Sequence, residues 1–370
     1  MYSDYEADMK YIQDGIVQNA KRFRNSLDIL EGKYANRRGV TPYEVVYSRN
    51  RFRVLRYVSD VPKRFKTPMV FCYALINKYY VLDMTEDKSF VRFLLDKGWD
   101  VYMIDWGKPS KIEGRNTFSD YIERYMARGI KKILEITGEQ QINLFGYCLG
   151  SIMSMVYTAV HQDVVKNLIV LTPPVDFSDD GVLTKMSQSE HFDPRAIADH
   201  FQHLIPPEMI HGGFKFKDAL GNLTTPMTYW KILWNEKALG DYFAMNGWVE
   251  DNVPIAAAFW TELVEKMYKN NAMMNNTFRM SGVEVDFKNI TCPMLSIGAS
   301  KDNIVTPKSA KGAMEITGSK DSTFVMKKGG HIGVITGNVA KRELWPDVHE
   351  WASKRSDRVV IKKGAVTKVK

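Results

Sequence analysis

The sequence predicts an α/β protein whose mostly parallel sheet is covered by helices on both faces. From residue 69 onward, short and continuously apolar segments alternate with amphipathic helical ones, and glycines follow several of the helices. Continuous apolar strands are typical of a sheet that is buried on both sides. The alternation stops at residue 177 and resumes at 289, which predicts a helical cap inserted before the strand that carries a candidate acid.

The chain begins with a segment, residues 1–38, that predicts an N-terminal helical arm. Met9, Ile16, Phe23 and Leu30 recur every seven residues, with polar residues at most positions between them. This narrow apolar seam fits a helix that docks against another helix or a domain surface. Packing on its own domain and binding of a partner explain the seam equally well.

The core of the fold is expected over residues 39–176 and 289–353. The predicted strands are 44–47, 52–58, 69–75, 99–106, 141–147, 167–172, 294–298 and 323–327, of which the first two form a hairpin. The predicted helices are 89–97, 118–137, 149–161 and 339–353, with one more after Pro307.

Two further segments complete the predicted organisation. The cap, residues 177–288, is rich in Met and Trp and contains Pro206-Pro207 and Gly212-Gly213. It is expected to form helices and irregular loops without buried strands. Residues 354–370 are expected to form a basic C-terminal tail.

Composition excludes several classes of protein. The 370 residues are 45% hydrophobic and 25% charged, which is ordinary for a globular chain and excludes wholesale disorder. The net charge is +8, and the last segment alone carries seven basic residues and one acidic residue, so the remainder is too mildly basic for a nucleic-acid binder. Three cysteines without metal-ligand spacing indicate neither a disulfide framework nor a metal site, and they fit a reduced, cytoplasmic compartment. No secretory signal or apolar run long enough for a membrane span is apparent.

The strongest local signal is Gly146-Tyr147-Cys148-Leu149-Gly150, where a predicted strand runs into a predicted helix. This is the nucleophile-elbow pattern with Cys in place of Ser, and it predicts an α/β-hydrolase fold. The nucleophile of such an elbow sits on a sharp turn, and the flanking glycines keep the approach to it clear. The start of the following helix offers N–H groups and a positive dipole end, which activate a thiol and stabilise an oxyanion.

A cysteine nucleophile needs a base and a group that orients the base. In this type of fold the order along the chain is nucleophile, acid, histidine. Of the seven histidines, His331 follows a predicted strand through two glycines and should lie at the carboxyl edge of the sheet. Asp302 follows the preceding strand and is the predicted acid, whereas Asp105 precedes the nucleophile and ranks second.

Two backbone N–H groups are expected to hold the oxyanion. The first is that of Leu149, at the start of the helix. The second should come from the loop 74–80, where Ile76 or Asn77 is the expected donor.

A cysteine at the elbow also indicates the acyl donor. A thiolate that attacks an oxygen ester must form a less stable thioester, whereas attack on a thioester is close to balance. Cys148 therefore favours acyl transfer from a thioester such as an acyl-CoA over hydrolysis of simple esters.

Four stretches of the chain resemble the catalytic subunit of the short polyhydroxyalkanoate synthases, the two-component class III and class IV enzymes. The resemblance covers about residues 39–353 and is carried by residues 73–80, 101–107, 146–150 and 329–333. The catalytic Cys, Asp and His of the family fall on Cys148, Asp302 and His331. The sequence leaves open whether Asp302 orients His331 or helps to activate the incoming hydroxyl group.

The resemblance implies an acyltransferase that polymerises (R)-3-hydroxyacyl-CoA, with 3-hydroxybutyryl-CoA the expected monomer, into an intracellular polyester. Coenzyme A would be part of the substrate and a product, and no separate cofactor or metal is expected. The resemblance also implies a second subunit of the E or R type, a homo- or hetero-oligomer, and a cytoplasmic location at the surface of polyester granules.

Two alternatives stay open at this point. A hydrolase of the dienelactone-hydrolase type also uses Gly-Tyr-Cys-Leu-Gly with Asp and His, but it is usually shorter and lacks the Ile-Asn-Lys-Tyr-Tyr loop at residues 76–80. A non-catalytic granule-surface protein built on an inactive hydrolase fold is the other alternative, and the intact set of candidate catalytic residues argues against it.

Overall fold

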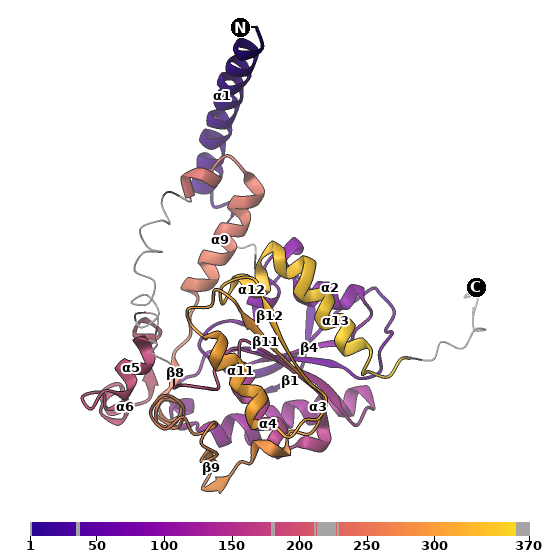
Figure 1. Ribbon diagram of the computed structural model, residues 1–370, viewed down its shortest axis with the longest axis vertical. Helices are drawn as coiled ribbons and strands as arrows, with labels where there is room; N and C mark the ends of the chain where they lie inside the picture. Colours follow the sequence, from indigo (N-terminus) through magenta and orange to yellow (C-terminus); the bar gives the residue numbers. More distant parts are fainter. Residues whose placement is uncertain are drawn as a thin grey trace, which may run out of the picture.

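A computed structural model describes residues 2–34, 38–178, 182–210, 212, 227 and 229–359. Its centre is an eight-stranded sheet with helices packed on both faces (Figure 1). The order of the strands is β1-β2-β4-β3-β5-β6-β11-β12. The pairs β1–β2 and β2–β4 are antiparallel, and every other neighbouring pair is parallel. Their bounds are β1 Tyr43–Arg49, β2 Phe52–Tyr57, β3 Met69–Cys72, β4 Val101–Asp105, β5 Ile142–Tyr147, β6 Val165–Leu171, β11 Met294–Ala299 and β12 Ser322–Lys327.

The predicted α/β-hydrolase fold is thus confirmed, and all eight predicted strands are present. The strand predicted over 69–75 is shorter than expected, because β3 ends at Cys72. Tyr73, Ala74 and Leu75 are as buried as the strand itself, so an apolar run alone could not show where the strand ends. The chain leaves the sheet there and forms the loop that faces the elbow.

The helices that flank the sheet start and end at residues with clear local roles. The Ser89 hydroxyl accepts the N–H of Arg92 at the start of α2. Thr306, which precedes the proline that opens α11, accepts the N–H of Ser309 in the same way. Gly138 has a φ of +72° and ends α3. The α-helices of the core are α2 Phe90–Asp96, α3 Ala127–Thr137, α4 Leu149–Val160, α11 Pro307–Ile316, α12 Gly333–Thr336 and α13 Trp345–Ser353.

Shorter helical turns complete the connections. The helices predicted over 118–137 and 339–353 each begin with a π-helical turn, Asp120–Met126 before α3 and Ala340–Leu344 before α13. The 3₁₀ turns are Tyr79–Leu82, Glu86–Lys88, Lys111–Arg115, Gln162–Val164 and Phe287–Asn289.

The segment predicted as a cap contains α5 Val182–Gln188, α6 Pro194–Phe201, α9 Glu236–Glu250 and α10 Ala257–Leu263, which runs on into a π-helical turn at Val264–Lys269. The expectation that it holds no buried strand is wrong, because β7 Leu204–Ile205 pairs with β8 Ile255–Ala256, and Ile205, Ile255 and Ala256 are buried. Each strand has two residues and its partner lies far away in the chain, so neither produces a periodic pattern. A further pair, β9 Arg279–Met280 and β10 Val283–Glu284, precedes the return to the core. The range 177–288 as a separate unit stays a prediction, and Gly213 lies outside the described residues.

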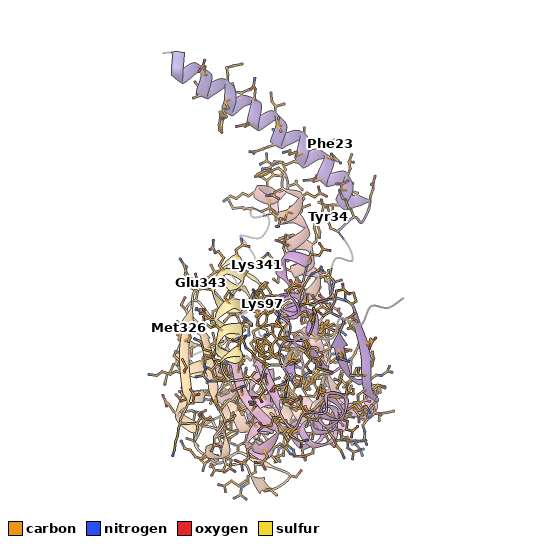
Figure 2. The ribbon with its side chains drawn as sticks, turned by 90° about the vertical axis from the view of Figure 1, so that its right-hand side faces the viewer. Phe23, Tyr34, Lys97, Met326, Lys341 and Glu343 are labelled. Atoms are coloured by element: carbon orange, nitrogen blue, oxygen red, sulfur yellow. The ribbon has the colours of Figure 1, made fainter. Side chains whose placement is uncertain are left out.

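The N-terminal arm is the helix α1, Tyr2–Leu30, which projects away from the body of the molecule (Figures 1 and 2). It meets the cap near its C-terminal end, where Asn25 donates to the carbonyl of Leu233 at 2.7 Å and the Arg22 guanidinium lies over the Trp230 ring. Of the tail predicted at 354–370, only residues up to 359 are described.

Candidate active site

The turn between β5 and α4 carries the candidate nucleophile, Cys148, in a strained backbone conformation. Its φ of +56° and ψ of −125° lie outside the regions that side-chain-bearing residues usually adopt. A Cβ added at Gly150 would lie 2.2 Å from the Cys72 carbonyl oxygen, and one at Gly146 would lie 2.6 Å from the Ser151 Cα. The two glycines are therefore required by close packing of the backbone around the elbow.

The structure brings the three predicted catalytic residues together. Asp302 follows β11, His331 follows β12, and these neighbouring strands end at the same edge of the sheet. The Nδ1 atom of His331 lies 2.7 Å from the Asp302 carboxylate, and the imidazole also hydrogen-bonds the side chain of Cys148. Both His331 and Asp302 are buried. The arrangement has the connectivity of a nucleophile, a base and an orienting acid.

The carboxylate of Asp302 is itself held in place by the backbone. Its Oδ1 atom accepts the N–H groups of Ile304 and Val305, each at 2.8 Å. The other oxygen, Oδ2, is thereby left to face the imidazole. Such support fixes both the orientation and the tautomer of a catalytic histidine.

The surroundings of His331 favour its charged form. Burial lowers the pKa of His331, but the charge of Cys148 and the hydrogen bonds to Asp302 and Cys148 raise it further than burial lowers it, to about 10. The imidazole is therefore protonated at neutral pH and loses its proton only as the pH rises toward 10. A cation beside the sulfur favours the thiolate, which is the nucleophilic form of cysteine.

This charge distribution predicts selective alkylation of one cysteine. Burial raises the pKa of the Cys72 thiol to about 12 and that of Cys292 to about 11, so both should be unreactive at pH 7. Iodoacetamide in limiting amount is expected to label Cys148 at least about tenfold faster than either, as measured by peptide mass spectrometry. The His331→Gln variant, which lacks the cation, should label Cys148 more slowly. Equal labelling of all three cysteines would contradict an activated thiolate.

Tyr147 packs against the candidate base, His331. Sequence reasoning did not single out this residue. Its ring stacks on the imidazole of His331, with centroids 5.4 Å apart, and its hydroxyl donates to the His331 carbonyl oxygen at 3.0 Å. Tyr147 is 2% exposed, so these contacts exclude water from that side of the imidazole. Tyr147 stands at the variable position between Gly146 and Cys148, and the sequence gave no sign of its role because its partner, His331, lies far away in the chain.

Removal of the Tyr147 hydroxyl should disturb the base without removing the stacked ring. The Tyr147→Phe variant is expected to lower the rate of Cys148 alkylation and of turnover by about three- to tenfold, the value of one hydrogen bond. The matched control is Tyr157→Phe, which changes a buried tyrosine of α4 and should leave both rates unchanged. A Tyr147→Phe protein with unchanged alkylation kinetics would show that the hydroxyl has no positioning role.

Cys148 opens onto a pocket with mostly apolar walls. Ile76 and Leu149 line it close to the elbow, and residues of the core and the cap line the rest, among them Ile152, Phe177, Met209, Trp260 and Leu263. The few polar groups include Thr184 and Ser187 of α5. Such a surface suits an acyl chain, because apolar walls bind a substrate mainly through burial of its hydrocarbon part.

The two expected oxyanion donors differ in their placement. Leu149, the first residue of α4, lines the pocket beside Cys148. Of the two candidates in the loop after β3, Ile76 is among the described residues that line the pocket and Asn77 is not. Ile76 is therefore the candidate of this loop that the structure places at the pocket, and the oxyanion hole stays a prediction.

The cap holds the loop that contains Ile76. Trp248 of α9 donates its indole N–H to the Lys78 carbonyl at 2.8 Å, and the N–H of Val253 donates to the Ile76 carbonyl at 3.3 Å. Asp251 also accepts a hydrogen bond from the Tyr80 hydroxyl. These bonds tie the loop to α9, so the cap contributes to the shape of the site.

Asp105, the second-ranked carboxylate, has another role in the structure. It forms an ion pair with Arg53 at 2.6 Å and accepts hydrogen bonds from Tyr73 and from the N–H of Gly107. It therefore stabilises the end of β4, while the imidazole of His331 bonds to Asp302.

In the part of the chain that the structure describes, no group of three or more His, Cys, Asp or Glu side chains could hold a metal ion. Among the same residues, no helix is long and apolar enough to cross a membrane.

The fold and the site together define an α/β-hydrolase-fold enzyme with a cysteine at the nucleophile elbow. A family model for the α/β-hydrolase fold matches residues 67–338, and the model of the poly-β-hydroxybutyrate polymerase (PhaC) N-terminus matches residues 31–94. The chain belongs to the PhaC family of poly(3-hydroxyalkanoate) polymerases and is an enzyme of the acyltransferase type.

Several relatives share most of this chain. The poly(3-hydroxyalkanoate) polymerase subunit PhaC of Allochromatium vinosum is 32% identical over 86% of this chain and 90% of its own length. The subunit of the same name from Haloferax mediterranei is 32% identical over 86% of this chain, and the chain spans 65% of that longer relative. That of Synechocystis is 29% identical over 93% of this chain and 95% of its own length.

Solved structures share the fold at low sequence identity. A protein described as a lipase from Sulfolobus solfataricus is 13% identical, covers 85% of this chain and 99% of its own, and superposes with a TM-score of 0.54. A metagenome-derived lipolytic enzyme is 9% identical, covers 81% of this chain and 97% of its own, and has a TM-score of 0.50. At these identities the likeness concerns the fold alone.

Proposed function

We propose that this chain polymerises (R)-3-hydroxyacyl-CoA, with 3-hydroxybutyryl-CoA the expected monomer, through a covalent acyl-cysteine on Cys148. The observation that carries the proposal is the convergence of Cys148, His331 and Asp302, of which Cys148 lines an apolar pocket. Coenzyme A enters as part of the substrate and leaves as a product, and the proposed chemistry requires no other cofactor and no metal.

In the first half of the reaction, the proton of the Cys148 thiol resides on His331. The thiolate attacks the carbonyl carbon of the acyl-CoA thioester, and the resulting oxyanion accepts the N–H groups of Leu149 and Ile76. The bond from carbon to the coenzyme A sulfur then breaks, and the departing thiolate takes the proton from His331. The products are free coenzyme A and an acyl group bound to Cys148.

In the second half, the neutral His331 accepts the proton of a hydroxyl group from another hydroxyacyl unit. The alkoxide oxygen attacks the acyl-cysteine carbonyl, an ester bond forms, and the Cys148 thiolate leaves. The hydrogen bond that Nδ1–H of His331 donates to Asp302 supports an orienting role for this carboxylate, because it fixes the tautomer that leaves the other ring nitrogen free to exchange protons.

The apolar pocket and the thiol nucleophile both favour transfer over hydrolysis. A buried acyl-cysteine in an apolar pocket is shielded from water, and a hydroxyacyl unit held there presents its hydroxyl group as the acceptor. The PhaC names of the relatives support the polymerase and do not favour the dienelactone-hydrolase alternative or the non-catalytic alternative.

We further propose that a second subunit of the E or R type associates with this chain, in a homo- or hetero-oligomer, and that the complex works at the surface of polyester granules in the cytoplasm. The apolar product and the membership of the PhaC family support this part of the proposal. Co-expression with candidate subunits, followed by purification through a tag on this chain, tests the association.

The test of the activity compares two substrates. Purified chain, alone and with candidate second subunits, is incubated with 3-hydroxybutyryl-CoA, and the release of coenzyme A and the formation of polymer are measured. The same preparations are offered a simple lactone and a simple ester. Thiol release with polymer formation supports the proposal, whereas lactone hydrolysis without thiol release would refute it.

A further inference from the structure

The helix α1 is long, exposed and in contact with the body near one end. Its 29 residues span about 43 Å. Figures 1 and 2 show it extending away from the sheet and the cap, with Phe23 on the part that projects. Among the described residues, its polar contacts with the body come from Arg22 and Asn25, near its C-terminal end.

The exposed face of α1 carries an apolar stripe in two parts, residues 9–16 and 23–30. The side chains of Ile16, Phe23 and Leu30 are 64%, 69% and 84% exposed, and those of Met9, Ile12 and Leu27 are also exposed. Spacings of three, four and seven residues place all six on one side of the helix. Most of the stability of a helix in a protein comes from packing of its apolar face, so this stripe is expected to be covered in solution.

The stripe is symmetric about the point midway between Asn19 and Ala20. Residues at equal distances from this midpoint match in type: Met9 corresponds to Leu30, Ile12 to Leu27, and Ile16 to Phe23. Two copies of α1 that pair antiparallel about a two-fold axis at this point would therefore oppose an apolar residue to every apolar residue. Self-complementarity of this kind is what a two-fold interface between identical chains requires.

The charges on α1 also favour the antiparallel direction. The first half of the helix, residues 2–16, has four acidic residues and one basic residue, and the second half, residues 17–30, has three basic residues and one acidic residue. Parallel pairing in register would place the acidic half beside the partner's acidic half and the basic half beside the basic half. Antiparallel pairing avoids both repulsions and also aligns the two helix dipoles in opposite directions.

We propose that α1 is a dimerisation arm that pairs antiparallel with α1 of a second copy of this chain. The pairing buries the stripe of Met9, Ile12, Ile16, Phe23, Leu27 and Leu30 against the same stripe of the partner subunit. The two catalytic bodies then lie at opposite ends of the paired helices, and α1 leaves the site at Cys148 uncovered.

The oligomeric state tests the proposal directly. The full chain is expected to sediment as a dimer of twice 42.5 kDa at micromolar concentration. The double variant Ile16→Glu with Phe23→Glu should raise the dimer dissociation constant by at least about 100-fold, because it places four charges in the buried seam. The matched control is Tyr11→Glu, an exposed aromatic residue off the stripe, which should leave the dimer intact. Circular dichroism establishes that each variant is folded.

Cross-linking distinguishes the direction of pairing. No native cysteine lies in α1. A mixture of Met9→Cys and Leu30→Cys chains is expected to give a mixed disulfide between the two helices, identified by mass spectrometry of the linked peptides, while Met9→Cys chains alone should not cross-link. A monomeric wild-type chain, a dimer that persists in the double variant, or efficient linkage of Met9→Cys to itself would each overturn the proposal. The proposal would also be overturned if the α1 stripe were covered only by a different protein in the co-purified complex.

Discussion

The Cys148→Ala variant is expected to lose coenzyme A release and polymer formation by about 10⁴-fold or more, because removal of a covalent nucleophile removes the acyl-enzyme pathway altogether. The side chain is half-buried at the elbow, and alanine fills the same backbone position with a smaller group. The fold should therefore persist. Turnover of 3-hydroxybutyryl-CoA, polymer yield and thermal unfolding are measured on the same preparation.

The matched control for this variant is Cys292→Ala. Cys292 is also half-buried, and burial raises the pKa of its thiol to about 11, so it is not expected to react at neutral pH. Its replacement should leave turnover within about twofold of the wild type. Polymer that still accumulates in the Cys148→Ala variant would show that Cys148 is not the nucleophile.

The Asp302→Asn variant is expected to lower turnover by about 10²- to 10⁴-fold with little change in stability. The N–H groups of Ile304 and Val305 require an acceptor at Oδ1, so the amide oxygen of the asparagine takes that position. Its NH₂ group then faces Nδ1 of His331 and favours the tautomer that carries its proton on the other nitrogen. That nitrogen can no longer accept the proton of the thiol.

The pH dependence of alkylation separates this effect from simple misfolding. Asp302 raises the pKa of His331, so its neutralisation should lower that pKa and move the alkylation of Cys148 to higher pH. Asp286→Asn is the matched control. The Asp286 side chain also accepts a backbone N–H, that of Lys288, in a hydrogen bond of 2.9 Å, and it does not belong to the candidate site. An Asp302→Asn enzyme with wild-type turnover would exclude Asp302 as the orienting acid.

The position of each candidate catalytic residue along the chain could be predicted because it depends on short-range pattern. The sequence Gly146–Gly150 at a change from strand to helix predicted the elbow, and the structure shows the two close approaches that require glycine there. Asp302 and His331 were predicted from their order after two apolar strands. The predicted parallel sheet placed both residues at its carboxyl edge, whereas the pairing of β11 with β12, which brings them together, is seen only in the structure.

The support of the site could not be predicted, because it consists of contacts between residues far apart in the chain. Tyr147 anchors the His331 carbonyl across 184 positions, and Trp248 holds the Lys78 carbonyl across 170. The β7–β8 pair was missed for the same reason, since two-residue strands leave no periodic signal. Asp105 was a plausible alternative in the sequence, and only its ion pair with Arg53 shows where its charge is satisfied.

By itself, the sequence determined the order of strands and helices along the chain and the elbow, and it predicted the three candidate catalytic side chains, since backbone propensity and apolar periodicity act over a few neighbouring residues. Only the tertiary structure decided which carboxylate meets the imidazole, that the surroundings raise the pKa of His331, and that α1 projects with its apolar stripe exposed. The physical reason is that burial, charge and hydrogen bonding at a site are set by the elements that fold around it, and those contacts leave no mark in the local sequence.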